Sequence, residues 1–219
     1  MASKTRKTRK VTRPERADIA SVEALSPILK LPAIKAIGRI GEVADEPPLL
    51  AVSGATLAIG LIARDRRLAR AGAGMLVAHF IAIGIKTLGK NNVDRSRPPG
   101  LIKHGRYTMK PGHSRDKSMR SFPSGHTAGA VALARAVVRE YPERAGAAYG
   151  VAATLGALQV MRRAHYPGDV LAGTLVGVAS EAVAHGLLKP IEKAADLIMS
   201  QRNGSYCSIA DRLGPHELV

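Results

Sequence analysis

Aromatic residues and cysteine are scarce in this 219-residue sequence. It contains no Trp, aromatic residues make up 3%, and Cys207 is the single cysteine. One cysteine excludes a disulfide within the chain. The shortage of aromatic side chains argues against base stacking on single-stranded nucleic acid. The chain also lacks CxxC, HExxH, Walker and GxGxxG patterns, internal repeats of solenoid period, and the apolar core of a cleaved signal peptide at its N-terminus.

Acidic residues are also few. Seventeen Asp and Glu stand against 33 Lys and Arg, which gives a net charge of +16. Such a charge suits nucleic acid, anionic lipid or an anionic substrate, and the aromatic shortage disfavours the first. Hydrophobic residues make up 46%, carried by Ala, Gly, Leu and Val, which favours close packing of helices through small residues.

Long apolar stretches are the main structural signal. They cover residues 49–63, 71–89, 127–138, 145–161 and 170–188. The stretches are apolar all round rather than on one face, which favours a membrane over a solvated bundle. Most fall short of the ~20 residues that span a bilayer, so a soluble bundle is the alternative. We therefore expect an all-α, membrane-embedded bundle of five to six helices, with a site at one end.

The composition divides the chain into four parts. Residues 1–16 are mostly Lys, Arg and Thr and are expected to form a disordered basic tail. Residues 17–47 mix apolar and charged side chains, which predicts an interfacial or packing helix. Residues 48–188 hold the apolar stretches and form the expected core. Residues 189–219 read as a polar C-terminal tail.

The alternation of apolar stretches predicts which turns share a side. The basic turns 64–70 and 139–144 fall on one side with the tail after residue 188, and regions 90–125 and 162–169 fall on the other. The positive-inside rule assigns the arginine-rich turns to the cytoplasm. Regions 90–125 and 162–169 would then face the periplasm or the exterior, although loop 99–120 is also basic.

Three polar segments on that second side carry the chemistry. They run from Lys90 to Pro98, from Ser121 to His126 and from His165 to Asp169. Together they supply fixed cations, a serine, two histidines and a carboxylate, an inventory that suits cleavage of a phosphate ester through a covalent histidine intermediate. Each segment adjoins an apolar stretch, so we expect the site at a membrane surface.

The third segment supplies the candidate nucleophile. Asp169 follows His165 by four residues. In a helical turn, such a carboxylate can reach one ring nitrogen of His165 and leave the other nitrogen free to attack. The alternative is structural: Asp169 could cap a helix that starts near Val170.

The second segment supplies a proton donor and a phosphate cradle. Gly125 allows close backbone approach, and amides near the helix start that follows Ser124 can bind phosphate oxygens. His126 can protonate a leaving oxygen. The alternative here is a capped helix with an incidental histidine.

The first segment supplies cations. Lys90 ends an apolar stretch, and Arg97 precedes Pro98, which favours an extended conformation for the arginine. A guanidinium can hold two phosphate oxygens, and lysine adds a point charge. The alternative is positive charge flanking a membrane boundary, which is very common, and Arg95 could have only that role.

In combination, the three segments resemble the type 2 phosphatidic acid phosphatase family, whose superfamily includes bacterial acid phosphatases and vanadium haloperoxidases. The resemblance covers about residues 48–188 and rests on Lys with Arg-Pro seven residues on, then Pro-Ser-Gly-His, then His with Asp four residues on. It implies a helical core in which His165 attacks phosphorus, Asp169 orients it and His126 is the general acid. It further implies that the phosphate is bound by the following residues: Lys90, Arg97, Ser124 and the amide of Gly125.

The sequence departs from the family at one position. The family has an arginine six residues before the nucleophile, where this chain has Gln159. The side-chain amide of Gln159 is neutral, so it cannot hold two phosphate oxygens as a charged guanidinium does. We expect Arg162 or Arg163 to take that place, and we favour Arg162 because the residue three before His165 shares its helix face.

These features lead to one main expectation. The chain is expected to be an integral-membrane phosphatase of a lipid phosphate or diphosphate, such as phosphatidate, phosphatidylglycerophosphate or polyprenyl diphosphate. Lysine and arginine supply the positive charge, so neither metal nor other cofactor is expected. The alternatives are a soluble or peripheral acid phosphatase of the same fold and a non-catalytic basic protein that binds anionic lipid. No nucleic-acid partner is expected, and the sequence indicates no oligomeric state.

Overall fold

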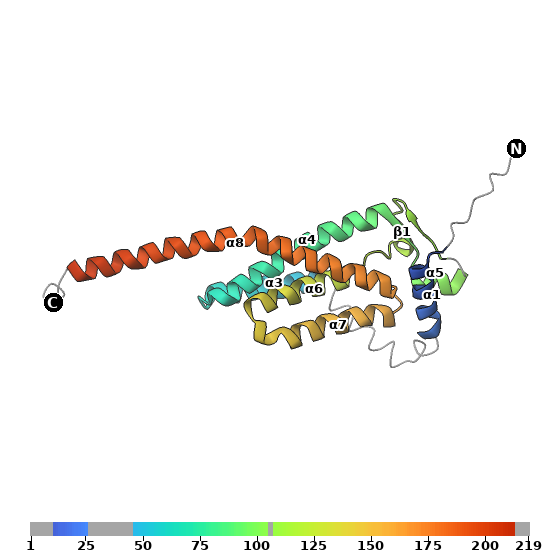
Figure 1. Ribbon diagram of the computed structural model, residues 1–219, viewed down its shortest axis with the longest axis horizontal. Coiled ribbons are helices and arrows are strands. Elements are labelled where there is room, and N and C mark those ends of the chain that lie inside the picture. The colour runs from blue at the N-terminus through green and yellow to red at the C-terminus, as the bar shows by residue number, and fades with distance from the viewer. Residues whose placement is uncertain (1–10, 26–45, 105–106, 213–219) are drawn as a thin grey trace.

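The computed structural model of the protein describes residues 11–25, 46–104 and 107–212, and its fold is all-α, as predicted (Figure 1). A two-stranded hairpin and two short 3-10 helices, η3 (Lys117–Met119) and η4 (Pro142–Arg144), complete it. The α-helices of the described residues are α1 (Arg13–Leu25), α3 (Glu46–Ile62), α4 (Arg66–Asn92), α5 (Pro98–His104), α6 (Gly125–Glu140), α7 (Ala145–Met161) and α8 (Pro167–Arg212).

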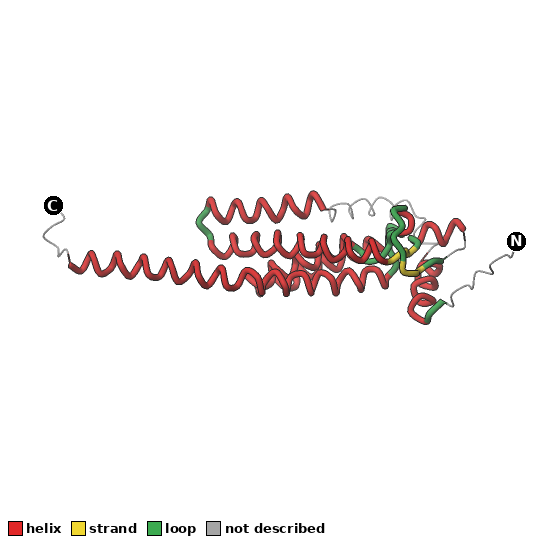
Figure 2. Tube along the Cα trace, turned by 90° about the horizontal axis from the view of Figure 1, so that it is seen from above, coloured by secondary structure: helices red, strands yellow, loops and turns green. Residues whose placement is uncertain are grey.

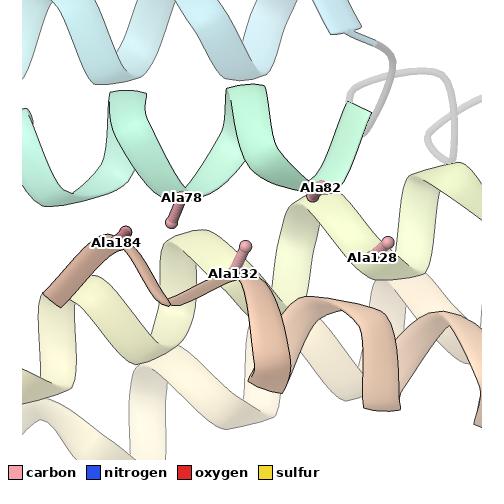
Figure 3. Close-up of a cluster of buried hydrophobic side chains, with 5 residues drawn as sticks. All are labelled: Ala78, Ala82, Ala128, Ala132 and Ala184. Carbon is pink, nitrogen blue, oxygen red and sulfur yellow. The ribbon is translucent and has the colours of Figure 1, made fainter. Parts of the chain in front are cut away.

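Five of these helices form an elongated bundle around α6. Helix α6 contacts α3, α4, α7 and α8, and its side chains from Thr127 to Ala134 are all buried. One core cluster consists almost entirely of alanine methyl groups from α4, α6 and α8 (Figure 3): Ala78, Ala82, Ala128, Ala132 and Ala184. The abundance of small residues is therefore what lets these three helices approach closely.

Two glycines of α8 make the closest approach to α6. A Cβ atom on Gly173 would lie 2.5 Å from the carbonyl oxygen of Ser124, and one on Gly177 would lie 2.6 Å from that of Ala128. Neither position has room for a side chain. The start of α8 is thereby held against the start of α6, which brings the second and third polar segments together.

The two ends of the bundle differ in chemistry, as the alternation of apolar stretches predicted. At one end Arg67 pairs with Glu143 at 3.0 Å and lies 4.1 Å over the ring of Tyr141. Arg70 there pairs with Asp196 of α8 at 2.6 Å. Helices α1 and α5 and strand β1 lie at the opposite end (Figure 1).

A small hairpin that the sequence pattern did not predict shapes that opposite end. Strand β1 (Val93–Arg95) directly follows α4 and pairs in antiparallel fashion with β2 (Met109–Pro111), with Arg95 opposite Met109. Ser121 donates its backbone N–H to the carbonyl of Arg95 at 3.1 Å. The hairpin thus fixes Arg95 beside the second polar segment.

Two boundaries differ from expectation. Helix α8 continues past Leu188 and through Pro190 to Arg212, so it projects well beyond the other helices (Figure 2). Residues 13–16, assigned by the sequence to a disordered tail, form the first turn of α1, because the Glu15 carboxylate accepts the backbone N–H of Thr12 at 2.6 Å and so caps the helix. Residues 1–10 and 26–45, which hold the rest of that tail and most of the predicted packing helix, lie outside the described residues.

In the part of the chain that the structure describes, two helices are long and apolar enough to cross a membrane by length and composition: α4 and the Pro167–Ile198 part of α8. Helix α3 is apolar but shorter. Large apolar side chains on these helices point outward, and examples that are more than half exposed are Ile62, Phe80, Leu88, Leu171 and Leu175.

The glycine contacts yield a prediction about stability. Gly177→Ala places a methyl group against Ala128 and should destabilise the fold by roughly 1–3 kcal/mol. Gly150→Ala on α7, where nothing lies within 4 Å of the added Cβ, should be neutral or stabilise by up to about 1 kcal/mol, because alanine favours helix. Thermal unfolding in detergent compares the two variants. Equal effects at the two positions would contradict the assigned packing.

Candidate active site

The three polar segments predicted from the sequence converge at one end of the bundle. Backbone hydrogen bonds link them: Ser121 N–H donates to Arg95, and Ser124 N–H donates to the carbonyl of Asp169 at 3.0 Å. The first segment is thus joined to the second, and the second to the third. No group of three or more His, Cys, Asp or Glu side chains among the described residues could hold a metal ion.

The two candidate catalytic histidines face each other. His126 is the second residue of α6, and His165 lies in the turn between α7 and α8. Their ring centroids are 6.3 Å apart, with 61° between the ring planes. The two rings are therefore close enough to contact a single group bound between them.

A helix-ending turn positions His165. Arg163 has a positive φ of 58° and follows the end of α7. Its N–H donates to the carbonyl of Val160 at 2.9 Å, and the N–H of Ala164 donates to that of Gln159 at 3.0 Å. This is the pattern of a Schellman cap. The N–H of His165 also donates to the Gln159 carbonyl, at 3.2 Å, so the end of α7 fixes the backbone of the histidine.

Asp169 caps a helix, as the structural alternative predicted, and it also lies beside the imidazole of His165; its orienting role stays a prediction. Helix α8 starts at Pro167, three residues before the expected Val170, and one carboxylate oxygen of Asp169 accepts the N–H of Tyr166 at 2.9 Å. That contact caps the helix. The same oxygen accepts the hydroxyl of Ser121 at 2.5 Å and lies 3.6 Å from Nδ1 of His165. The carboxylate is fully buried, so it stands behind the imidazole and away from solvent.

Ser124 and Gly125 shape the start of α6. The hydroxyl of Ser124 is buried, caps the helix by accepting the N–H of Thr127 at 3.4 Å, and lies 2.9 Å from the Thr127 hydroxyl. The Ser124 hydroxyl is thus engaged within the protein. A Cβ atom on Gly125 would lie 2.8 Å from Cδ of Lys86, so the absence of a side chain there admits a lysine to the start of the helix.

Several cations gather around the histidines. Lys90 lies near enough to Lys86, Arg97 and Arg120 for their charges to repel its own. Burial lowers the pKa of Arg97, with Asp169 opposing this shift and Arg162 adding to it. Nε of Arg97 is buried with no hydrogen-bond partner among the described residues. Arginine stays charged at any accessible pH, so this end of the bundle is strongly positive.

The environment of His165 favours its neutral form. The side chain is 1% exposed, and burial lowers its pKa below the ordinary value of 6.5. The positive charges of Arg97 and Lys90 act in the same direction, and Asp169 opposes them. A neutral imidazole has a lone pair available for attack.

Gln159, at the position where the family has arginine, is turned toward its own helix. It is fully buried, and its amide donates to the carbonyl of Leu155 at 3.3 Å. Its side-chain oxygen has no hydrogen-bond partner among the described residues. Arg162 lies near enough to Arg97 for their charges to repel.

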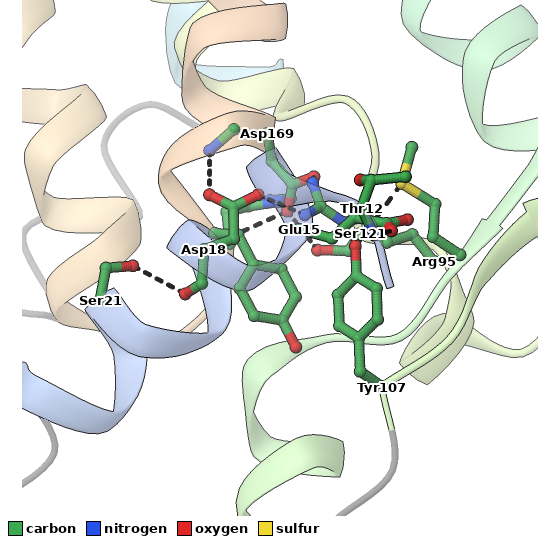
Figure 4. Close-up of polar contacts among 12 residues, drawn as sticks. Thr12, Glu15, Asp18, Ser21, Arg95, Tyr107, Ser121 and Asp169 are labelled. Atoms are coloured by element: carbon green, nitrogen blue, oxygen red, sulfur yellow. Dashed lines mark hydrogen bonds and ion pairs between the residues drawn. The ribbon is translucent and has the colours of Figure 1, made fainter. Parts of the chain in front are cut away.

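The interpretation of Arg95 as flanking charge is wrong. Its side chain is 3% exposed, and its two terminal nitrogens each lie 2.5 Å from a carboxylate oxygen, one of Asp169 and one of Asp18 (Figure 4). A sequence shows only that an arginine lies near a helix end. The hairpin that turns this arginine inward, and the acid that meets it from α1, depend on the tertiary fold.

Sequence reasoning also missed three other residues at this end. Ser121 lay inside a recognised segment, but nothing marked its hydroxyl as a partner of Asp169. Lys86 lies within the apolar stretch 71–89 and was assigned no role, and it pairs with Glu46 at the start of α3. Asp18 lies in a region assigned to a packing helix. A charged residue inside an apolar stretch is the one signal that could have identified Lys86.

Comparison with known proteins agrees with this geometry. The model of the PAP2 superfamily matches residues 70–190, more than half of the chain. A lipid A 1-phosphatase of Rhizobium johnstonii is 36% identical over 95 residues, which cover 42% of this chain and 38% of the relative. That of Rhizobium etli is 35% identical over 95 residues, covering 42% and 40%, and that of Porphyromonas gingivalis is 34% identical over 83 residues, covering 36% and 19%. The matches thus span two fifths or less of these relatives. No solved structure shows a significant match.

Proposed function

The chain belongs to the PAP2 superfamily, and on that basis we propose that it is an integral-membrane phosphatase that removes phosphate from a lipid phosphate or diphosphate. The observation that carries the proposal is the pair of facing histidines, one of them backed by a buried carboxylate. Nearby cations complete a site suited to a phosphoryl group.

In the first step, the imidazole of His165 attacks phosphorus. Nδ1 faces Asp169, which leaves Nε2 to form the N–P bond while the P–O bond to the lipid breaks. His126 faces His165 and donates a proton to the departing oxygen. The lipid leaves as an alcohol, or as a monophosphate when the substrate is a diphosphate, and a phosphohistidine remains.

In the second step, water replaces the histidine. His126, now neutral, accepts a proton from the water as its oxygen attacks phosphorus. The N–P bond breaks, inorganic phosphate departs and His165 is restored. His126 thus serves as acid and then as base, which requires a position that reaches the same atoms in both steps.

Fixed positive charge stabilises the transition state in this proposal. Phosphoryl transfer spreads negative charge over the equatorial oxygens, so positioned cations and amides supply most of the rate enhancement. Lys90, Arg97 and Arg162 provide the charge, and the N–H groups of Gly125 and the next residues provide the start of a helix. Because Ser124 is engaged as a cap, we assign it a lesser share of phosphate binding. No metal is required.

The exposed apolar side chains support integration in a membrane. Large apolar groups cover the outer faces of α3, α4, α7 and α8, which a soluble bundle would leave in contact with water. The arginine-rich turns lie at the end opposite the histidines, and the positive-inside rule assigns them to the cytoplasm. The site would then face the periplasm or the exterior of the inner membrane, at headgroup depth.

The relatives add one candidate substrate. All three are lipid A 1-phosphatases, so we add lipid A to the lipid phosphates that this chain is proposed to hydrolyse. The alternatives are a peripheral acid phosphatase of the same fold and a basic protein that binds anionic lipid without turnover.

Phosphate release from a lipid panel tests the proposal. Purified protein in detergent should release inorganic phosphate from at least one of lipid A, phosphatidate, phosphatidylglycerophosphate and polyprenyl diphosphate. His165→Asn should lower the rate by ~10³-fold or more because the nucleophile is lost. His185→Asn, in α8 near Glu140 at the far end of the bundle, is the matched control and should retain the rate.

Three outcomes would count against the proposal. Equal rates for His165→Asn and wild type would exclude the histidine mechanism. Turnover of soluble phosphate esters alone, by protein that stays in solution without detergent, would favour the acid phosphatase. Binding to anionic vesicles with no release from any substrate would favour the lipid-binding alternative.

Arg162 yields another prediction, because it lies near Arg97 and is our proposed replacement for the cation missing at Gln159. Arg162→Gln should lower kcat/KM roughly ten- to hundred-fold, since one charged hydrogen bond contributes ~1.5–3 kcal/mol. Arg163→Gln removes the same charge from the neighbouring position and should have a smaller effect. Gln159→Arg in the Arg162→Gln background should restore part of the loss. If both arginines can be replaced by glutamine with no change in rate, Lys90, Arg97 and backbone amides alone stabilise the transition state.

A further inference from the structure

Helix α1 lies outside the segment that the PAP2 superfamily model matches, yet it delivers an acid to the site. Asp18 is buried, and one of its oxygens accepts Nη2 of Arg95 at 2.5 Å. The other oxygen accepts the N–H of Gly168 at 2.8 Å, in the first turn of α8. A Cβ atom on Gly168 would lie 2.5 Å from Asp18, so the glycine is what admits the carboxylate.

Arg95 transmits this contact to Asp169. Its Nη1 donates to Oδ1 of Asp169 at 2.5 Å, and its Nε donates to the hydroxyl of Tyr107 at 3.1 Å. The ring of Tyr166 stacks on it at 4.6 Å. All three nitrogens of the guanidinium are thus engaged within the protein (Figure 4). Arg95 therefore does not contact substrate. It links a carboxylate of α1 to the one behind the nucleophile.

The charges explain why a second carboxylate matters. Arg95 with its two carboxylates carries a net charge of −1, and this cluster lies behind His165. A further buried carboxylate of α1, Glu15, lies near Tyr107. Without Asp18, Arg95 would neutralise Asp169, and the carboxylate would support the imidazole less. The groups that face His165 from elsewhere are Lys90 of α4, Arg97 after β1 and His126 of α6, with Arg162, directly after α7, beside Arg97. None of these adds negative charge.

We propose that Asp18 is a positioning residue for the reaction, which through Arg95 holds the Asp169 carboxylate in place and keeps a net negative charge behind the nucleophile. The inference rests on the proposed function, because it assumes that His165 attacks phosphorus. It makes α1 part of the functional site, although α1 lies before the family core.

The competing explanation is that Asp18 only docks α1 onto the bundle. A docking role would affect stability and leave the protonation of His165 unchanged. Asp18→Asn separates the two roles, because an amide of the same shape can still accept a hydrogen bond but carries no charge. Glu23→Gln is the matched control, since Glu23 is exposed on the same helix and loses the same charge.

Two readouts test the proposal: kcat and KM on the preferred lipid phosphate, and titration of His165 by NMR of histidine-labelled protein, assigned with His165→Asn. In wild type the titration midpoint should lie below 6.5. Removal of a nearby negative charge lowers a histidine pKa further. Asp18→Asn should therefore move the midpoint down and lower kcat roughly tenfold or more, with KM within about twofold. Glu23→Gln should leave both readouts unchanged. Asp18→Glu should return the midpoint toward wild type and recover part of kcat.

The outcomes separate the two claims. If Asp18→Asn matches Glu23→Gln in both kcat and titration midpoint, Asp18 has no positioning role. If Asp18→Asn does not fold, Gly168→Ala displaces the carboxylate without removing its charge and should still lower kcat, and an unchanged kcat would overturn the proposal. A wild-type protein that turns over no lipid phosphate, but whose His165 midpoint falls in Asp18→Asn, would refute the proposed function and support the link from Asp18 to His165.

Discussion

The ion pairs of Arg95 with Asp18 and Asp169 are the contact on which the rest of this site depends. Both carboxylates are buried, and a buried carboxylate without a partner costs several kcal/mol. One guanidinium satisfies both of them at 2.5 Å. The contact joins α1, the β1 hairpin and the first turn of α8, three elements far apart in the sequence. His165, Ser121 and Tyr166 then take their places around Asp169, which is the member of the network nearest the chemistry.

Small residues make that arrangement possible. Gly168 admits Asp18, Gly173 admits the carbonyl of Ser124, and Gly125 admits Lys86. Each lies where a Cβ atom would overlap a neighbouring group. An alanine-lined bundle core holds the same helices together at the level of Ala82 and Ala128. The composition, rich in Ala and Gly and poor in aromatics, is thus connected to function. Small side chains let the helices pack closely, and close packing lets polar segments from different helices meet.

The sequence predicted the helices and the convergence of the three polar segments well, because both follow from local pattern. Apolar stretches bounded by basic turns determine the helices, and their alternation brings Lys90, His126 and His165 to one end. It did not predict the hairpin, the inward orientation of Arg95 or the role of Asp18. These features depend on tertiary contacts of Arg95 with Asp169 and Asp18, which lie 74 and 77 positions from it in the sequence. The helix through residues 189–212 was also missed, because its polar composition does not distinguish a long helix from a tail. For Asp169, the sequence left the capping and orienting interpretations open; the structure shows the capping hydrogen bond, and the same carboxylate oxygen lies 3.6 Å from Nδ1 of His165.

The central claim is that His165 carries phosphate during turnover, and detection of that intermediate tests it most directly. Protein mixed with a lipid phosphate labelled in its phosphoryl group and quenched at alkaline pH, where phosphohistidine survives, can be digested and mapped by mass spectrometry. We expect label on the peptide that contains His165, and an increased amount when His126→Asn slows attack by water. Release of labelled phosphate with no label on the protein at any time, in wild type and in His126→Asn, would contradict the covalent mechanism.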